Sequence, residues 1–142
     1  MQSPLPIIVG GGGAKRTPAL AARFATEFNL PFVPFDEIGG KFAGVHAACE
    51  AIGRNPDELV YSAAFVAAAG ANEAEYVRRS SAIGRQPDEL RQNGLAGTAS
   101  EIVDRLGSLQ DDGVECAYLQ ILDLGDLDHL EFVAAEVVPH FS

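Results

Sequence analysis

Tryptophan is absent from this sequence, cysteine occurs twice, and the ten lysine and arginine residues are half as numerous as the acidic ones. The resulting net charge of −10 argues against binding to nucleic acid or to acidic membrane surfaces, because both need a basic footprint. The apolar segment 59–70 is too short to span a membrane and reads as a buried strand. We therefore expect neither nucleic acid nor membrane as a partner.

The cysteine usage is that of a reducing cytoplasm. Cys49 and Cys116 lie far apart and in no CxxC spacing, so each is expected to be a small buried side chain and not a nucleophile. The first residues show no basic start and no long apolar core, so no signal peptide is expected. At 142 residues, the chain 1–142 is predicted to be one domain, and its many alanines and glycines suit tightly packed layers.

The segment Pro6–Thr17, with the sequence PIIVGGGGAKRT, predicts a strand, a glycine loop and a helix start. Thr17 is the expected N-cap, with Pro18 at the first helical position. Glycines let a backbone approach a ligand closely, and the free N–H groups of a helix start attract anions. Lys15 and Arg16 would add positive charge. This loop is the best candidate in the sequence for a phosphate site.

Two established phosphate motifs do not fit the loop. Ala14 and Arg16 replace the glycine and the hydroxyl residue of a Walker A loop, and Lys15 replaces the third glycine of GxGxxG. The residues alone therefore leave two alternatives open, a phosphate site and a flexible turn without a ligand.

Strands and helices are expected to alternate along the whole chain. Strands are predicted at 5–9, 27–32 (ending at Asn29 or Leu30), 59–68 and 116–122. Helices are predicted at 18–25, from an N-cap at Asp36 to Gly53, at 72–82 after an N-cap at Asn72, from a Thr98–Glu101 capping box to Gly113, and from an N-cap at Asp126 to Pro139. Segments 55–58 and 86–91 are predicted to be capped turns. The expected buried faces are Leu20, Ala21, Phe24 and Ala25; Ile38, Phe42, Val45, Cys49 and Ile52; Ile102, Val103, Leu106 and Leu109; and Leu127, Leu130, Val133, Ala134 and Val137.

One nonapeptide recurs almost unchanged: AIGRNPDEL at 51–59 returns as AIGRQPDEL at 82–90. The sequences around the two copies do not match, so we interpret the echo as shared helix-end chemistry and not as a solenoid.

Four alternating strand–helix units predict a parallel α/β sheet with right-handed crossovers. This pattern fits a small doubly wound sheet and also half of a (β/α)₈ barrel, and periodicity does not decide between them.

The order of motifs resembles the luciferase-like monooxygenase superfamily. The resemblance runs from PIIVGGGGAKRTPALAARFATEFN through CEAIGRNPDEL and GTASEIVDRLGSLQDDGVECAYLQ to LDHLEFVAAEVVPHF, and so covers essentially the whole chain. The ending is similar to the branch that depends on the deazaflavin coenzyme F420. The resemblance implies a parallel (β/α)4 half of a TIM barrel, corresponding to its fifth to eighth strand–helix units.

Residue by residue, the resemblance places the coenzyme phosphate on the glycine loop. The implied cofactor is F420 or FMN, and the implied binding residues are Gly11, Gly12, Gly13, Lys15, Arg16, Thr17 and Asn29. Two departures occur, Thr26-Glu27-Phe28 in place of Ala-Asp-x-Trp before Asn29, and Ala99 in place of proline.

The resemblance also implies that half of a barrel is missing. The strands that carry most contacts to the coenzyme ring have no counterpart here, so we expect no turnover by the chain alone, and an oxidoreductase or monooxygenase activity only with an N-terminal half. We expect a homo-oligomer or a complex with such a half. The alternative is a non-catalytic oligomeric half-barrel that binds a phosphate-bearing ligand or none.

No catalytic residue can be assigned from the sequence. His46 is expected on a partly exposed helix face, His129 in a structural role, and His140 in solvent. The acidic residues after the last predicted strand, Asp123, Asp126 and Asp128, are interpreted as caps and a solvated loop, so no metal site is expected.

Overall fold

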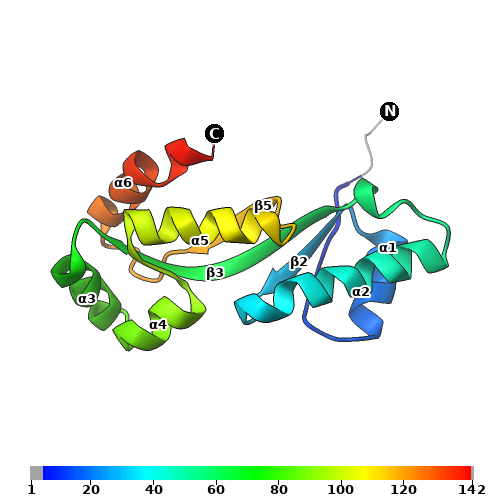
Figure 1. The fold of residues 1–142 in the computed structure, drawn as a ribbon, viewed down its shortest axis with the longest axis horizontal. Helices are drawn as coiled ribbons and strands as arrows, with labels where there is room; N and C mark the ends of the chain where they lie inside the picture. The colour runs from blue at the N-terminus through cyan, green and yellow to red at the C-terminus, as the bar shows by residue number, and fades with distance from the viewer. Residues whose placement is uncertain (1–4, 142) are drawn as a thin grey trace. The chain divides into compact units, whose positions relative to one another are not determined.

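The computed structural model describes residues 5–141 (Figure 1). These residues form two compact units. The first unit contains residues 5–64 and 112–118, and the second contains residues 65–111 and 119–141. Among the residues described, no helix combines the length and the apolar character needed to cross a bilayer.

The first unit is built on a parallel sheet in the order β1 (Ile8–Gly10), β2 (Glu27–Pro31), β3 (Val60–Gly70). Val9 lies opposite Phe28, and Phe28 lies opposite Tyr61, so these side chains share one face of the sheet. The connecting helices are α1 (Arg16–Phe24) and α2 (Ile38–Ala51), the latter preceded by the 3₁₀ turn η1 (Phe35–Glu37). β5 (Cys116–Gln120) also pairs with β3.

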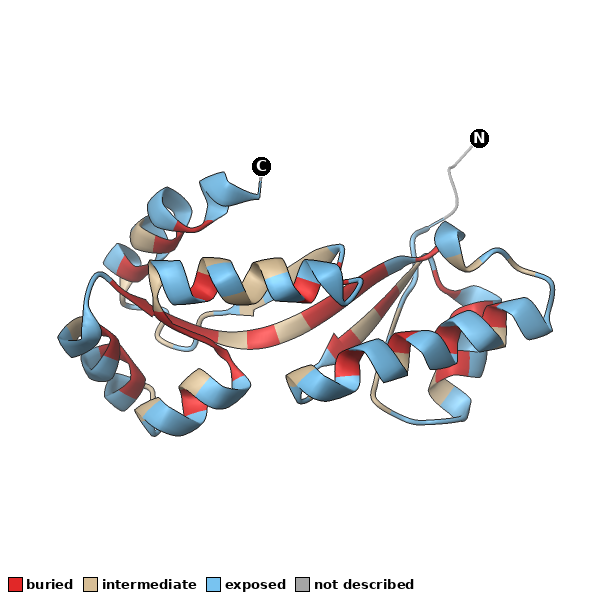
Figure 2. Ribbon diagram, viewed as in Figure 1, coloured by how far each residue is buried: buried red, intermediate tan, exposed pale blue. Residues whose placement is uncertain are grey.

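The core of the first unit forms where α2 packs on this face. Ile38, Phe42, Val45 and Cys49 are buried as predicted, and the buried positions follow one side of α2 in Figure 2. The Phe42 ring makes edge contacts with Phe28 and Tyr61, at centroid distances of 6.2 and 5.1 Å. The predicted burial of Ile52 is wrong, because α2 ends at Ala51 and Ile52 is 54% exposed.

The second unit surrounds the later half of β3. Its elements are α3 (Glu73–Ala82), α4 (Pro87–Asn93), β4 (Leu95–Thr98), α5 (Ala99–Asp111), α6 (Leu127–Glu136) and the 3₁₀ turn η3 (Val138–His140). β4 pairs in parallel with β3, with Ala68 opposite Ala96. These two alanines form a buried cluster with Tyr76 and Leu90, which joins α3 and α4 to the sheet.

The parallel α/β fold agrees with the prediction, but β4 was missed. The sequence predicted only a helix cap in this segment, because two of its four residues are Gly97 and the capping residue Thr98. The segment 86–91 is a second correction, since it belongs to the helix α4 and not to an isolated turn. Its buried Leu90, and the bond from the Tyr76 hydroxyl to the Pro87 carbonyl at 2.6 Å, hold that helix against α3.

Three of the predicted helix caps are confirmed. Asn72 and Asp126 accept the N–H groups of Glu75 and His129 at 3.0 Å, and Thr98 and Glu101 form the reciprocal capping box. Asp36 is not an N-cap, because it lies inside η1 and the chain enters α2 already helical at Glu37.

The two copies of the nonapeptide end their helices in the same way, as predicted. In both copies the glycine has a positive φ, +75° at Gly53 and +70° at Gly84. The following arginine N–H then bonds back to a carbonyl of the last helical turn, Arg54 to Cys49 at 3.0 Å and Arg85 to Ser80 at 2.9 Å. The second copy continues into α4, whereas the first forms only the 3₁₀ turn η2 (Pro56–Glu58).

Two predicted apolar faces are only partly buried in the single chain. On α1, Ala21 and Ala25 are buried, but Leu20 and Phe24 are 47% and 53% exposed. On α6, Val133 and Val137 are buried as expected, but Leu127, Leu130 and Ala134 are exposed, whereas His129 takes a buried position. The α5 face is partly as predicted, with Ile102 and Leu109 buried and Val103 and Leu106 half-buried.

Candidate functional site

The glycine loop leaves β1 through a conformation that only glycine adopts readily. Gly11 has a φ of +140°, and its N–H donates to the Asn29 carbonyl at 3.1 Å, which holds the start of the loop against β2. A Cβ on Gly13 would lie 2.9 Å from the Thr17 hydroxyl, so a larger residue at this position would force the Thr17 side chain to shift. At Gly12 a Cβ would meet only Val33 at 3.7 Å, an ordinary contact.

The helix after the loop starts earlier than predicted. α1 begins at Arg16, and the boundary residue Lys15 makes no side-chain cap, so Thr17 lies inside the first turn and is not the N-cap. Pro18 is tolerated at the third position, because N–H groups of the first turn have no acceptor within the helix. Lys15 and Arg16 are both exposed.

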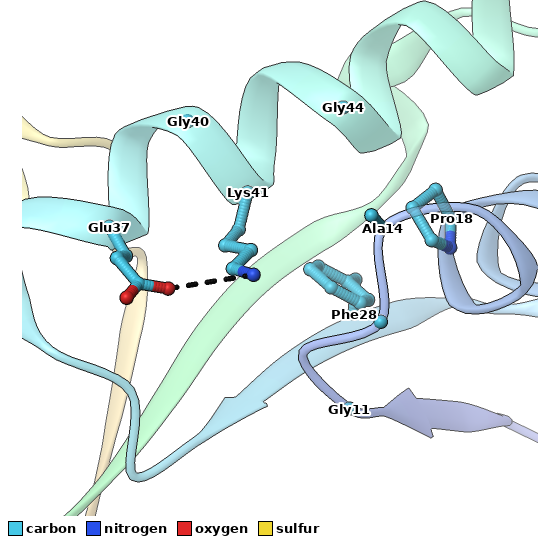
Figure 3. A pocket seen from close by; sticks show the side chains of 9 residues that line it. Gly11, Ala14, Pro18, Phe28, Glu37, Gly40, Lys41 and Gly44 are labelled. Carbon is cyan, nitrogen blue, oxygen red and sulfur yellow. Dashed lines mark ion pairs between the residues drawn. The ribbon is translucent and has the colours of Figure 1, made fainter.

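A cavity of about 370 Å³ opens between this loop and α2 (Figure 3). Its walls are mostly small or apolar: the loop on one side, Pro18 and Phe28 behind it, and the first turns of α2 opposite. The lining residues are Gly11, Gly13, Ala14, Pro18, Phe28, Glu37, Gly40, Lys41 and Gly44. The volume is within the range of small-molecule sites.

The charged groups of this cavity come from α2 and from the 3₁₀ turn before it, and they were not predicted from the sequence. Lys41 Nζ donates to the Gly12 carbonyl at 2.9 Å and lies 3.5 Å from a Glu37 carboxylate oxygen. Figure 3 shows the Lys41 side chain extending from α2 toward the loop. The available signal was the glutamate–lysine pair four residues apart around Gly39-Gly40.

Asn29 lies in the middle of β2 and on the other face of the sheet from Phe28. Its Nδ2 donates to the Ser62 hydroxyl at 2.9 Å, and Ser62 donates to Glu27 Oε1 at 2.6 Å. The Tyr118 hydroxyl donates to the same carboxylate oxygen at 2.9 Å, and this bond raises the pKa of Tyr118 to about 12. The glycine loop and Asn29 therefore both adjoin the β1–β2 strand pair. The loop follows the end of β1, whereas the Asn29 side chain lies on one face of the pair.

The cavity combines features that suit an anionic ligand with one carboxylate, that of Glu37. The glycines that line the cavity leave room for a bulky group, and a ligand can approach the backbone of the loop closely. The ammonium group of Lys41 lies beside the loop. These features fit a phosphate. The described part of the chain contains no group of three histidine, cysteine or acidic residues able to hold a metal ion.

Three of the candidate residues in the second unit, His129, Asp123 and Asp126, have structural partners. His129 is buried, and its Nε2 accepts the Ala69 N–H at 2.8 Å. Arg79 is also buried and bonds to Asp126, Glu75 and the Ala69 carbonyl at 2.9, 3.0 and 2.7 Å. Asp123 accepts the Gly125 N–H at 3.1 Å in the loop before α6. In the first unit, His46 is exposed with its ring 4.8 Å from that of Tyr61.

No protein-family model and no curated protein sequence matches the chain, but solved structures do. A coenzyme F420-dependent tetrahydromethanopterin reductase from Methanopyrus kandleri matches with a TM-score of 0.77 at 16% identity, over 97% of this chain and 51% of the reductase. An F420-dependent secondary alcohol dehydrogenase, solved with an F420–acetone adduct, matches with a TM-score of 0.76 at 13% identity, over 99% and 50%. The oxygenating constituent of 3,6-diketocamphane monooxygenase from Pseudomonas putida, solved with FMN, gives 0.66 and 17%, over 95% and 48%.

The chain has the fold of half of such a protein. It spans about half the length of the solved structures it matches. The fold implied by the luciferase-like resemblance is therefore confirmed, as a partial barrel of parallel strands and alternating helices. Since the identities are all low, the likeness establishes the fold, and the ligand has to be argued from the site.

Proposed function

We propose that this chain provides the coenzyme-phosphate-binding half of an F420- or FMN-dependent oxidoreductase. The observation that supports the proposal most directly is the glycine loop after β1, which opens onto a cavity with an ammonium group beside it. The fold adds support, because the structures it matches include two F420-dependent enzymes and one FMN complex. In parallel α/β folds, ligands bind where the carboxyl ends of the strands meet the following loops.

The proposed contacts are Gly11, Gly12, Gly13 and Thr17 for the phosphate, with Lys15 and Arg16 as outer charges. Asn29, on the opposite face of β2 from Phe28, is kept as a contact for another part of the coenzyme. When bound, F420 or FMN would supply the redox chemistry, while these residues would bind and orient it. A coenzyme held mainly at its phosphate is not positioned for hydride transfer, so we expect binding without turnover by the chain alone.

The test uses Gly12→Val and each coenzyme in turn. A Cβ at Gly12 meets only Val33, at 3.7 Å, so we expect the fold to accept valine there. If the phosphate lies against the loop backbone, as proposed, the added side chain takes up space that the phosphate needs. We therefore expect this variant to lose F420 or FMN binding, measured by fluorescence titration, while its melting temperature stays close to that of the unchanged chain.

Gly107→Ala, in α5 of the second unit, is the matched control, because a Cβ there meets no atom within 4 Å. It should bind as the unchanged chain does. If neither coenzyme binds to the unchanged chain, or if Gly12→Val binds equally well, the proposed site is wrong, and the non-catalytic half-barrel becomes the better description. Coenzyme-dependent reduction by the pure chain above a buffer blank would contradict the expected lack of turnover.

A further inference from the structure

The cation that lines the cavity and contacts the glycine loop is not one of the two that follow the loop in the sequence. Lys15 and Arg16 are exposed, and neither belongs to the set of residues that line the cavity. Lys41 does line it, and its Nζ lies 2.9 Å from the carbonyl of Gly12, the central residue of the loop. The positive charge that lines the cavity therefore comes from α2.

The Lys41 ammonium has a donor to offer a ligand. An ammonium carries three N–H donors, and the structure engages it with two groups, the Gly12 carbonyl at 2.9 Å and the Glu37 carboxylate at 3.5 Å. The carbonyl contact holds the charge at the loop before any ligand arrives. A phosphate oxygen entering beside the loop would find this donor in place, with little rearrangement of the side chain.

Helix α2 leaves open space around Lys41. Gly40 and Gly44 both line the cavity, and a Cβ built on either meets no heavy atom within 4 Å. Glycine inside a helix is less favourable than alanine, so Gly40 and Gly44 make α2 less stable where these two residues line the cavity. Packing does not require glycine at these positions, whereas a ligand in the cavity would.

We propose that Lys41 is the cation that contacts the phosphate of the bound coenzyme, and that Glu37 opposes this contact. The proposal rests on the proposed function. The Glu37 carboxylate beside Lys41 attracts the ammonium and repels an incoming phosphate, so it lowers the affinity that Lys41 provides. Lys41 and Glu37 should therefore affect coenzyme binding in opposite directions.

The test measures the Kd of F420 and of FMN for Lys41→Met, Glu37→Gln and the double variant Lys15→Met with Arg16→Met. We expect Lys41→Met to weaken binding about tenfold or more, as for loss of a charged hydrogen bond. Glu37→Gln should strengthen it about two- to threefold, and the double variant should weaken it only about twofold, well short of the loss for Lys41→Met, because Lys15 and Arg16 are exposed outer charges. The first two effects should shrink as the salt concentration rises.

The outcomes separate this inference from the proposed function. If the unchanged chain binds neither coenzyme, the proposed function fails and this inference fails with it. If the unchanged chain binds coenzyme and only the double variant of Lys15 and Arg16 binds it more weakly, the proposed function is supported and the assignment to Lys41 is wrong. If Lys41→Met weakens binding but Glu37→Gln does not strengthen it, Lys41 only positions the loop, and the proposed contact is overturned.

A second pair of variants tests whether the ligand needs the open space beside α2, and neither variant changes a charged residue. Gly40→Ala and Gly39→Ala raise helix propensity equally, and a Cβ meets no atom within 4 Å at either position, but only Gly40 lines this cavity. We expect Gly40→Ala to weaken coenzyme binding and Gly39→Ala to leave it unchanged, with both melting temperatures raised. Equal binding by the two variants would contradict a ligand against this part of α2.

Discussion

At the scale of single residues, His129 links the stability of the second unit to pH. Its ring is buried and accepts the Ala69 N–H at Nε2. Burial lowers the pKa of His129 below 6.5, and the nearby Arg79 lowers it further, against the smaller opposing effects of Asp126, Glu75 and Asp123. The folded chain therefore binds fewer protons at this histidine than the unfolded chain does.

Stability should fall as the pH drops below about 6.5, the unfolded value, toward the lowered folded pKa. We expect His129→Gln to remove this part of the pH dependence, because an amide oxygen can still accept the Ala69 N–H but does not titrate. Urea unfolding of both proteins at about pH 7.5 and about pH 5.5 measures it. The same substitution at the exposed His46 is the control. A pH dependence unchanged by His129→Gln would contradict this coupling.

At the scale of elements, the sequence predicted those features that depend on local chemistry. The Asn72 and Asp126 caps, the Thr98–Glu101 box and the helix ends at Gly53 and Gly84 all follow from side-chain or backbone preferences of a few residues, and all are confirmed. The core face of α2 was also predictable, because its apolar spacing is helical.

The features that sequence patterns missed are decided by tertiary contacts. The short strand β4 exists because it pairs with β3, and α4 extends beyond a turn because Leu90 is buried against α3 and the sheet. The candidate site divides in the same way. The glycine loop was identified from local sequence, whereas Lys41 reaches it from α2 across 29 residues of chain.

The end of α1 is stabilised by an arginine from the first nonapeptide copy. Arg54 donates to the carbonyls of Ala22 and Ala25 at 3.0 and 2.8 Å, and so satisfies acceptors that the helix itself leaves open. We expect Arg54→Met to lower the free energy of unfolding by about 1–3 kcal/mol, measured by urea denaturation.

The second nonapeptide copy supplies the matched control. Arg85 occupies the same position after a glycine of the same conformation, but its side chain is exposed. Arg85→Met should change the free energy of unfolding by less than about 0.5 kcal/mol. Equal losses for the two variants would mean that the arginines act through the helix-end turn and not through the α1 carbonyls.

At the scale of the whole molecule, apolar surface left open by the single chain predicts self-association. Ile7 and Ile8 at the edge strand β1 are 45% and 54% exposed, and Leu124 and Leu127 before and in α6 are 81% and 62% exposed. Unpaired strand edges and open apolar faces favour pairing with another chain. We expect a homo-oligomer at micromolar concentration, measured by sedimentation velocity.

Ile8→Lys tests the edge strand directly. The Ile8 side chain is half exposed, so a lysine should be tolerated by the fold, while its charge would disfavour pairing at that edge. We expect this variant to shift the population toward monomer. A pure unchanged chain that sediments as a well-behaved monomer would rule out self-association and would leave a complex with a complementing half.

The three tyrosines of this tryptophan-free chain differ in burial and in the unit to which they belong. Tyr61 is buried in the first unit and Tyr76 in the second, each with its hydroxyl bonded to a backbone carbonyl, whereas Tyr118 is 42% exposed. Because tryptophan is absent, the phenol rings dominate the intrinsic ultraviolet emission, with one shielded ring in each unit. Replacing Tyr61 or Tyr76 by phenylalanine would silence the shielded ring of one unit and leave that of the other, so that loosening of the two units can be followed optically and separately, without an attached dye.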